Sequence, residues 1–283
     1  MFHLKNAQLN VEILDPALDL ARLGSRYCVG GYIYQVTDQA LGPLLAGPQF
    51  PATNPDVFHG QGAPEQFVRV LNENAELGEE VAVIGVGRVR RTGQLKPSFA
   101  HNNPEVLRFL PWLVESTPTS FTLTSEDTFE DQAYRLKRTV SLNERSLSSE
   151  TQIENTGARP LPIEWFAHPF FPLTDGGTCC KPSLAVRVPE NAGYALNQAG
   201  FIEQKTQSDW ARGYYLALEF EPATEPLRML QRHPKLGQVL AETNFPPQRL
   251  PIWGNDRTFS FEPYFIRELS AGNSAEFGIR YDF

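Results

Sequence analysis

Short runs in which apolar and polar residues alternate dominate the chain. FTLTSED (121–127) shows the pattern clearly and YRLKRTVSL (134–142) roughly, and SLSSETQIENTG (146–157) ends in an Asn-Thr-Gly turn. Similar runs are LPIEWFAHPFF (161–171), YYLALEF (214–220), RTFSFEPYF (257–265) and AEFGIRYDF (275–283). Alternation of this kind is typical of half-buried β-strands. We therefore expect strands separated by turns over most of the chain.

Helix signals are scarce, because 23 prolines and 21 glycines are scattered along the 283 residues. Strands with little helix between them indicate an antiparallel β-sandwich or barrel. No composition break marks a domain boundary, so we expect an all-β protein folded as a single domain over residues 1–283. The Pro-rich stretch 42–67 predicts a long irregular connection, and such loops in compact β domains are usually functional.

Charge and cysteine content narrow the classes of partner. The chain carries 25 basic and 33 acidic side chains, a net charge of −8, which argues against a nucleic-acid or anionic-membrane partner. The three cysteines, Cys28, Cys179 and Cys180, are odd in number and two are adjacent, so they do not form a disulfide framework. No signal peptide and no apolar run of about 18 residues is evident. We expect a cytoplasmic protein.

One histidine stands in an aromatic strand. His168 lies in WFAHPFF (165–171), where a buried imidazole must find a hydrogen-bond partner or face a ligand cavity. On a strand, Glu164, Phe166 and His168 share one face. The pattern therefore fits two interpretations: a satisfied His–Glu pair in the core, or a histidine that meets a ligand.

A carboxylate occupies similar surroundings near the C-terminus. Glu262 lies in TFSFEPYF between Phe261 and Tyr264, and burial there would raise its pKa. Ser260 shares its strand face. An imidazole and a carboxylate together can supply a general acid and a general base. With Trp165, Phe166 and Trp253 nearby in sequence, the pair fits a carbohydrate site, because aromatic rings stack on sugar rings.

His59 is the other histidine of interest. In VFHGQG it precedes one glycine and lies near a second, where the backbone can turn tightly and approach a ligand. A loop histidine capped by a backbone carbonyl is an equally good interpretation of the same residues.

The order of these motifs resembles that of the galactose mutarotase-like (aldose 1-epimerase) proteins. The stretch from YRLKRTVSL through IENTG to AHPFF is similar to the middle of that family, with its histidine followed by an aromatic pair. FSFEPY is similar to the late strand with Glu-Pro, FHGQG to the loop with the first histidine, and LSAGNSAEFGIRYDF to the closing turn and strand. The resemblance extends from about residue 9 to the end of the chain and places the protein in a divergent branch.

The resemblance implies a fold, an activity and a set of site residues. The fold would be one large antiparallel β-sandwich, the super-sandwich. The activity would be interconversion of the anomers of an aldose through ring opening, with Glu262 as base and His168 as acid. It implies no cofactor and no metal, a small sugar as partner, and a monomer or homodimer. We expect the sugar to be held by His59, Gln61, Glu65, Arg69 and Trp253.

Departures from the family pattern leave alternatives open. HPFFPL replaces the usual His-x-Tyr-Phe-Asn-Leu run, and the arginine that follows the His-Gly in hexose-6-phosphate mutarotases is missing near Ala63. Arg69, Arg88, Arg90 and Arg91 could still hold a phosphate. The alternatives are a hexose-6-phosphate mutarotase, a non-catalytic sugar-binding or sugar-sensing β-sandwich, and a lyase or hydrolase. The last normally needs two carboxylates, and only Glu262 stands out.

Overall fold

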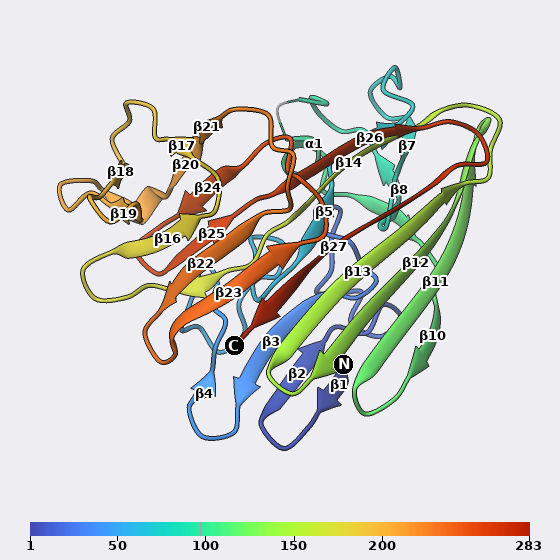
Figure 1. Cartoon of the computed structure of the whole chain (residues 1–283). Helices are drawn as coiled ribbons and strands as arrows, with labels where there is room; N and C mark the ends of the chain where they lie inside the picture. The colour runs from blue at the N-terminus through green and yellow to red at the C-terminus, as the bar shows by residue number, and fades with distance from the viewer. Residues whose placement is uncertain (97) are drawn as a thin grey trace.

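The computed structural model describes residues 1–96 and 98–283, and antiparallel strands are its main regular structure (Figure 1). Its largest sheet has ten strands in the order β10-β11-β12-β13-β27-β23-β22-β16-β19-β18. Their bounds are β10 Leu113–Ser116, β11 Ser120–Phe129, β12 Gln132–Asn143, β13 Ser146–Asn155, β16 Thr178–Pro182, β18 Tyr194–Leu196, β19 Ile202–Gln204, β22 Arg228–His233, β23 Gly237–Thr243 and β27 Ser274–Asp282. The strands expected at 121–127, 134–142, 146–157 and 275–283 are thereby confirmed.

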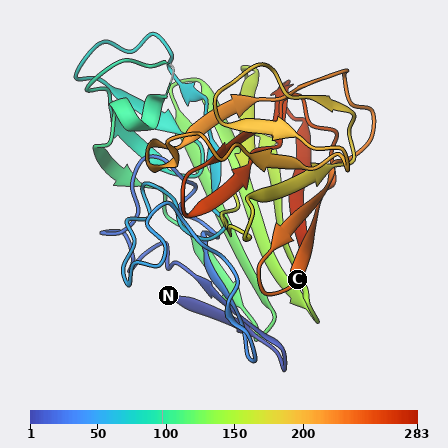
Figure 2. The same cartoon turned by 90° about the vertical axis from the view of Figure 1, so that its left-hand side faces the viewer.

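Two smaller sheets pack against the large one. The first has the order β26-β14-β5 and the second β15-β25-β24-β20. Their bounds are β5 Glu65–Phe67, β14 Leu161–Ala167, β15 Phe171–Pro172, β20 Tyr214–Ala217, β24 Pro251–Gly254, β25 Thr258–Phe261 and β26 Tyr264–Leu269. Aromatic contacts join the layers: the ring centroids of Trp165 and Phe277 are 4.9 Å apart. The result is the expected all-β sandwich, seen from a second side in Figure 2.

The remaining elements are short. They are β1 Phe2–Lys5, β2 Leu9–Ile13, β3 Ile33–Asp38, β4 Gly42–Pro43, β6 Val70–Leu71, β7 Glu80–Val83, β8 Gly87–Arg90, β9 Val106–Phe109, β17 Val186–Arg187 and β21 Glu219–Phe220, with the helix α1 Phe99–Asn102 and the 3-10 turn η1 Trp210–Arg212. Strands β1 to β4 form one sheet, β6 to β9 another, and β17 pairs with β21. Within residues 1–96 and 98–283, neither helical element is long and apolar enough to cross a bilayer.

Strand β12 shows how alternation builds the core and where a charged residue enters it. Leu136 and Val140 of β12 are buried, as period-2 alternation requires. Arg138, between them on the same face, is also buried, with 1% of its surface exposed. Its Nη1 lies 2.6 Å from Oε2 of Glu65 on β5, so a paired charge connects the two layers.

The two strands that carry His168 and Glu262 break at those residues. LPIEWFAHPFF forms β14 up to Ala167 and resumes as β15 at Phe171, while RTFSFEPYF forms β25 up to Phe261 and resumes as β26 at Tyr264. A proline follows each candidate residue directly and cannot donate to the ladder, which explains both interruptions. The register is the same on either side of the gap, with Phe166 opposite Tyr264 and Phe171 opposite Phe259. Continuing it across the gap places His168 opposite Glu262.

The stretch 42–67 is irregular between β4 and β5, as expected. It lies against the break in the first strand, because the Phe170 amide donates to the Gly62 carbonyl and the His168 amide to the Pro64 carbonyl, each at 2.8 Å. The loop therefore closes one side of the region around His168.

Candidate active site

His168 and Glu262 face each other inside the sandwich. His168 Nε2 lies 3.5 Å from Glu262 Oε1, and the two side chains are 3% and 7% exposed. The separation is longer than a strong charge-assisted hydrogen bond. Their backbones are fixed from outside the pair, since the His168 amide donates to Pro64 and the Glu262 amide to Pro251. The two breaks in the sheet thus bring an acid–base pair to one place.

Ser260 completes the arrangement on the imidazole side. Its Oγ lies 2.6 Å from His168 Nδ1, and the serine is fully buried. When the hydroxyl donates to Nδ1, the ring proton is on Nε2, the nitrogen that faces Glu262. Ser260 therefore orients the imidazole.

Burial shifts the pKa values of the pair in opposite directions. Loss of solvation raises the pKa of Glu262 from 4.5 to about 7, with the positive charges of Arg26 and Arg249 opposing the shift. Loss of solvation lowers the pKa of His168 below its usual 6.5, and the charge of Arg26 adds to that effect. Both shifts therefore favour the uncharged form of each group, with the proton on the Glu262 carboxyl group and a neutral His168 imidazole.

Aromatic rings line the imidazole side of the pair. Phe170 stacks on His168 with ring centroids 4.3 Å apart, and Phe166 lies at 5.7 Å. Trp253 contacts Phe170 edge-on at 6.1 Å and lies directly across from Ser260 in the sheet. Trp253 is partly exposed, so the aromatic surface extends from the buried pair toward solvent. Of the residues expected to hold a sugar, Trp253 is the one that these contacts connect to the pair.

Glu164 does not pair with His168. The sequence allowed a core His–Glu pair on this strand face, but the Glu164 carboxylate binds Arg249. The guanidinium of Arg249 also stacks on Tyr264, with its Cζ 4.1 Å from the ring centroid. The carboxylate partner of His168 is Glu262, which is distant in sequence.

Gln61, Glu65 and Arg69 have structural partners. The Glu65 carboxylate receives hydrogen bonds from Ser149 Oγ at 2.5 Å and Trp165 Nε1 at 3.2 Å, in addition to the ion pair with Arg138. Gln61 is buried, and its side-chain nitrogen Nε2 lies 3.5 Å from the Tyr34 carbonyl oxygen. Arg69 pairs with Glu73 at 2.5 Å. Among the described residues, none of these contacts joins the three side chains to His168 or Glu262, and their role in substrate binding stays a prediction.

His59 lies at the surface of the 42–67 loop. Its side chain is 54% exposed, and its Nε2 is 3.6 Å from Asp56 Oδ2. The neighbouring Gly60 instead reaches the site, because a Cβ there would collide with the ring of Phe170. A role for His59 in substrate binding stays a prediction.

The arginines considered for a phosphate site are engaged elsewhere. Arg88 binds Asp127 through two nitrogens, at 2.5 and 2.6 Å, Arg90 pairs with Glu105, and Arg91 donates to the Ala75 carbonyl. The cations that act on the pair are Arg26 and Arg249, which sequence patterns did not single out. Neither lies in a recognisable motif, and only the fold brings them near Glu262.

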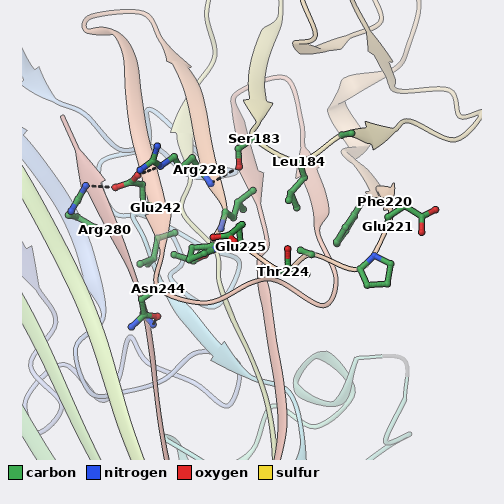
Figure 3. A pocket seen from close by; sticks show the side chains of 18 of the residues that line it. Ser183, Leu184, Phe220, Glu221, Thr224, Glu225, Arg228, Glu242, Asn244 and Arg280 are labelled. Carbon is green, nitrogen blue, oxygen red and sulfur yellow. Dashed lines mark hydrogen bonds and ion pairs between the residues drawn. The ribbon is translucent and has the colours of Figure 1, made fainter.

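A separate groove of about 970 Å³ lies on the outer face of the ten-stranded sheet (Figure 3). Glu242 lines it and is bound by both Arg228 and Arg280, so its charge is neutralised. Neither His168 nor Glu262 lines this groove. Among the described residues that line it, Phe220 is the aromatic one.

Comparisons with known proteins identify the fold. No protein-family model matches the chain, and no curated protein matches it. Its structure is similar to that of a galactose mutarotase related enzyme from Lactobacillus acidophilus, with 15% identity, 99% of this chain and 96% of that chain covered, and a TM-score of 0.61. It is also similar to an aldose epimerase homologue from C. elegans, with 14% identity, 99% and 97% coverage, and a TM-score of 0.56. A galactose mutarotase-like protein from Clostridium acetobutylicum has 11% identity, 99% and 93% coverage, and a TM-score of 0.56.

These similarities define the class of structure. The chain has the galactose mutarotase-like fold, as the sequence motifs implied. Identities at this level establish the fold, while the activity has to be argued from the site.

Proposed function

We propose that this protein is an isomerase of the aldose 1-epimerase type, acting on a small sugar. The observation that carries the proposal is the buried pair of His168 and Glu262, 3.5 Å apart, beside an aromatic surface that leads to solvent. An imidazole and a carboxylate can move two protons without a cofactor.

The reaction uses each group twice. Glu262 takes the proton from the C1 hydroxyl of the sugar while His168 gives a proton to the ring oxygen. The C1–ring oxygen bond breaks, and C1 becomes an aldehyde carbon. After rotation about the C1–C2 bond, the former ring oxygen attacks the other face of C1. It gives its proton back to His168, and Glu262 returns its proton to the C1 oxygen. The raised pKa makes the Glu262 carboxylate a stronger base, and the lowered pKa makes the protonated imidazole of His168 a stronger acid, so both shifts favour the proposed transfers.

A free sugar fits this proposal better than a phosphorylated one. Arg69 and Arg88 have carboxylate partners, and Arg91 donates to a backbone carbonyl. Using them for a phosphate would require breaking those contacts. We therefore expect the non-phosphorylated aldoses to be the better substrates.

A sugar-binding protein without turnover is the second candidate. The observation that favours it is burial: with side chains 3% and 7% exposed, the pair needs a local opening before a sugar can touch both groups. If such opening does not occur, the aromatic surface at Trp253 could still bind a sugar.

Anomer exchange distinguishes these candidates. Saturation-transfer NMR would follow a panel of aldoses and their 6-phosphates with the wild type and with His168→Ala. We expect exchange above the spontaneous rate for free aldoses and its loss in the variant. His233→Ala is the matched control, because His233 is equally buried but its Nε2 contacts the Leu44 carbonyl. No acceleration for any sugar, together with shift changes on binding, would favour the binding protein.

A further inference from the structure

Tyr27 lies against the imidazole of the candidate site. Its ring is 3% exposed and contacts His168 edge-to-face, with centroids 6.1 Å apart and an interplanar angle of 70°. The backbone beside it is fixed to the sandwich, since the Cys28 amide donates to the Glu65 carbonyl at 2.8 Å. Because Glu65 pairs with Ala167 in the sheet, this bond sets Tyr27 next to His168.

The hydroxyl of Tyr27 is buried without a hydrogen-bond partner among the described residues. Gly60 lies close to it, since a Cβ at that position would come within 3.2 Å of the hydroxyl oxygen. A buried hydroxyl that makes no hydrogen bond disfavours the folded state, so such groups are rare and call for an explanation.

Tyr32 provides the contrast. Its ring packs edge-to-face on Tyr27 with centroids 5.8 Å apart, and it is 2% exposed. Its hydroxyl accepts a hydrogen bond from the backbone amide of Gln61 at 3.2 Å and donates one to the Val57 carbonyl at 3.3 Å. The Tyr32 hydroxyl thus forms its hydrogen bonds within the fold. The Tyr27 hydroxyl, at the site, forms none with the described residues.

Tyr27 is equipped to donate rather than to accept a proton. Burial raises the pKa of its hydroxyl well above 10, and the carboxylate of Glu262 adds to the shift. The guanidinium of Arg26, with its Cζ 4.7 Å from the Tyr27 ring centroid, opposes it without reversing it. The hydroxyl therefore keeps its proton at neutral pH.

We infer that the Tyr27 hydroxyl donates a hydrogen bond to a substrate oxygen on the His168 side of the site, and so acts as a third polar group there. The inference rests on the proposed function for the identity of the substrate. A neutral donor beside His168 stabilises negative charge that develops on that oxygen while the imidazole delivers its proton.

Tyr27→Phe and Tyr32→Phe form a matched pair for the test. In Tyr27→Phe we expect kcat/KM for aldose anomer exchange to fall by about tenfold or more, the loss of one well-placed donor. We expect the Tm of the free protein to stay unchanged or to rise, because no internal bond is removed. Tyr32→Phe should give the reverse pattern, a lower Tm with kcat/KM near the wild-type value.

Each outcome decides the inference. A Tyr27→Phe variant with full kcat/KM in an active wild type would overturn it and leave the proposed function standing. A fall in Tm like that of Tyr32→Phe would also overturn it, since the hydroxyl would then have a partner in the fold. If the wild type accelerates no aldose, the proposed function fails, and sugar titrations followed by NMR decide: weaker binding in Tyr27→Phe supports the donor, and no difference overturns it.

Discussion

At the scale of single residues, burial determines what His168 and Glu262 can do. The same loss of solvation disfavours the charged form of each group, and therefore raises one pKa and lowers the other. Ser260 fixes the orientation of the imidazole through its contact with Nδ1 of His168. Aromatic neighbours exclude water without offering hydrogen bonds, which is why a carboxylate among phenylalanines was a candidate from sequence alone.

The raised pKa of Glu262 predicts a pH-dependent stability difference. The folded chain holds this proton to about pH 7 and the unfolded chain only to about 4.5, so ionisation destabilises the fold as pH rises through this window. Glu262→Gln should therefore exceed the wild type in stability by up to about 3 kcal/mol above pH 7 and match it below about pH 4.5. Thermal or urea unfolding across pH measures this difference. Glu242→Gln, on the outer face, is the control and should lack that profile; a flat difference for Glu262→Gln would show that its carboxylate is not desolvated.

Ser260 yields a second prediction at this scale. Ser260→Ala should lower kcat by about 10- to 100-fold, because the imidazole loses its orienting partner. Thr258→Val is the matched control: it lies two residues away on β25, is fully buried, and its hydroxyl donates to the Phe171 carbonyl at 2.8 Å. It should cost stability and spare kcat. Equal kcat values in the two variants would contradict the orienting role.

At the scale of elements, the site exists because two strands are interrupted. Pro169 and Pro263 end the ladder immediately after His168 and Glu262. The loop 42–67 accepts from the His168 and Phe170 amides, while Pro251 accepts from the Glu262 amide. The prolines are visible in the sequence, yet their effect on the pairing becomes clear only when the two strands are known to be neighbours.

The prediction for the loop 42–67 concerns a substitution at Gly60. Gly60 and Gly78 both have positive φ, 110° and 92°, but a Cβ at Gly78 meets nothing within 4 Å whereas one at Gly60 collides with Phe170. Gly78→Ala should cost about 1–2 kcal/mol of stability from backbone strain alone. Gly60→Ala should cost clearly more and reduce anomer exchange, because Phe170 must shift against His168. Unfolding and exchange rates check both, and similar effects in the two variants would argue against the loop as a wall of the site.

At the scale of the whole molecule, apolar contacts and a buried ion pair join the layers of the sandwich. Arg138 of the large sheet and Glu65 of the small one meet at 2.6 Å, with Ser149 and Trp165 completing the carboxylate's hydrogen bonds. A buried charge that loses its partner is strongly destabilising.

Glu65→Gln tests whether that residue belongs to the fold or to the substrate site. We expect a loss of about 3–5 kcal/mol in stability, since Arg138 would be left uncompensated. The KM of the folded fraction should not change. A raised KM with normal stability would restore Glu65 to the substrate-binding set that the sequence suggested.

Much of the fold was predictable, and less of the site. Strands such as β11 to β13 follow simple alternation, and the motifs around His168 and Glu262 lie where the resemblance implied. From the sequence, Arg138 is a polar residue in a strand. Its burial depends on the ion pair with Glu65, which is 73 positions away. Arg26, Tyr27 and Arg249 belong to no periodic pattern, so their places near the pair could come only from the three-dimensional arrangement.

The most direct test of the account is anomer exchange in Glu262→Gln, measured by saturation-transfer NMR beside sugar binding in the same samples. The account predicts that most of the turnover disappears while the affinity for the sugar stays near that of the wild type, because the amide keeps the shape of the carboxyl group and cannot take a proton. Glu242→Gln should retain full turnover. Full exchange in Glu262→Gln would contradict the assignment of Glu262 as the base and, with it, the acid–base pair on which the proposed function rests.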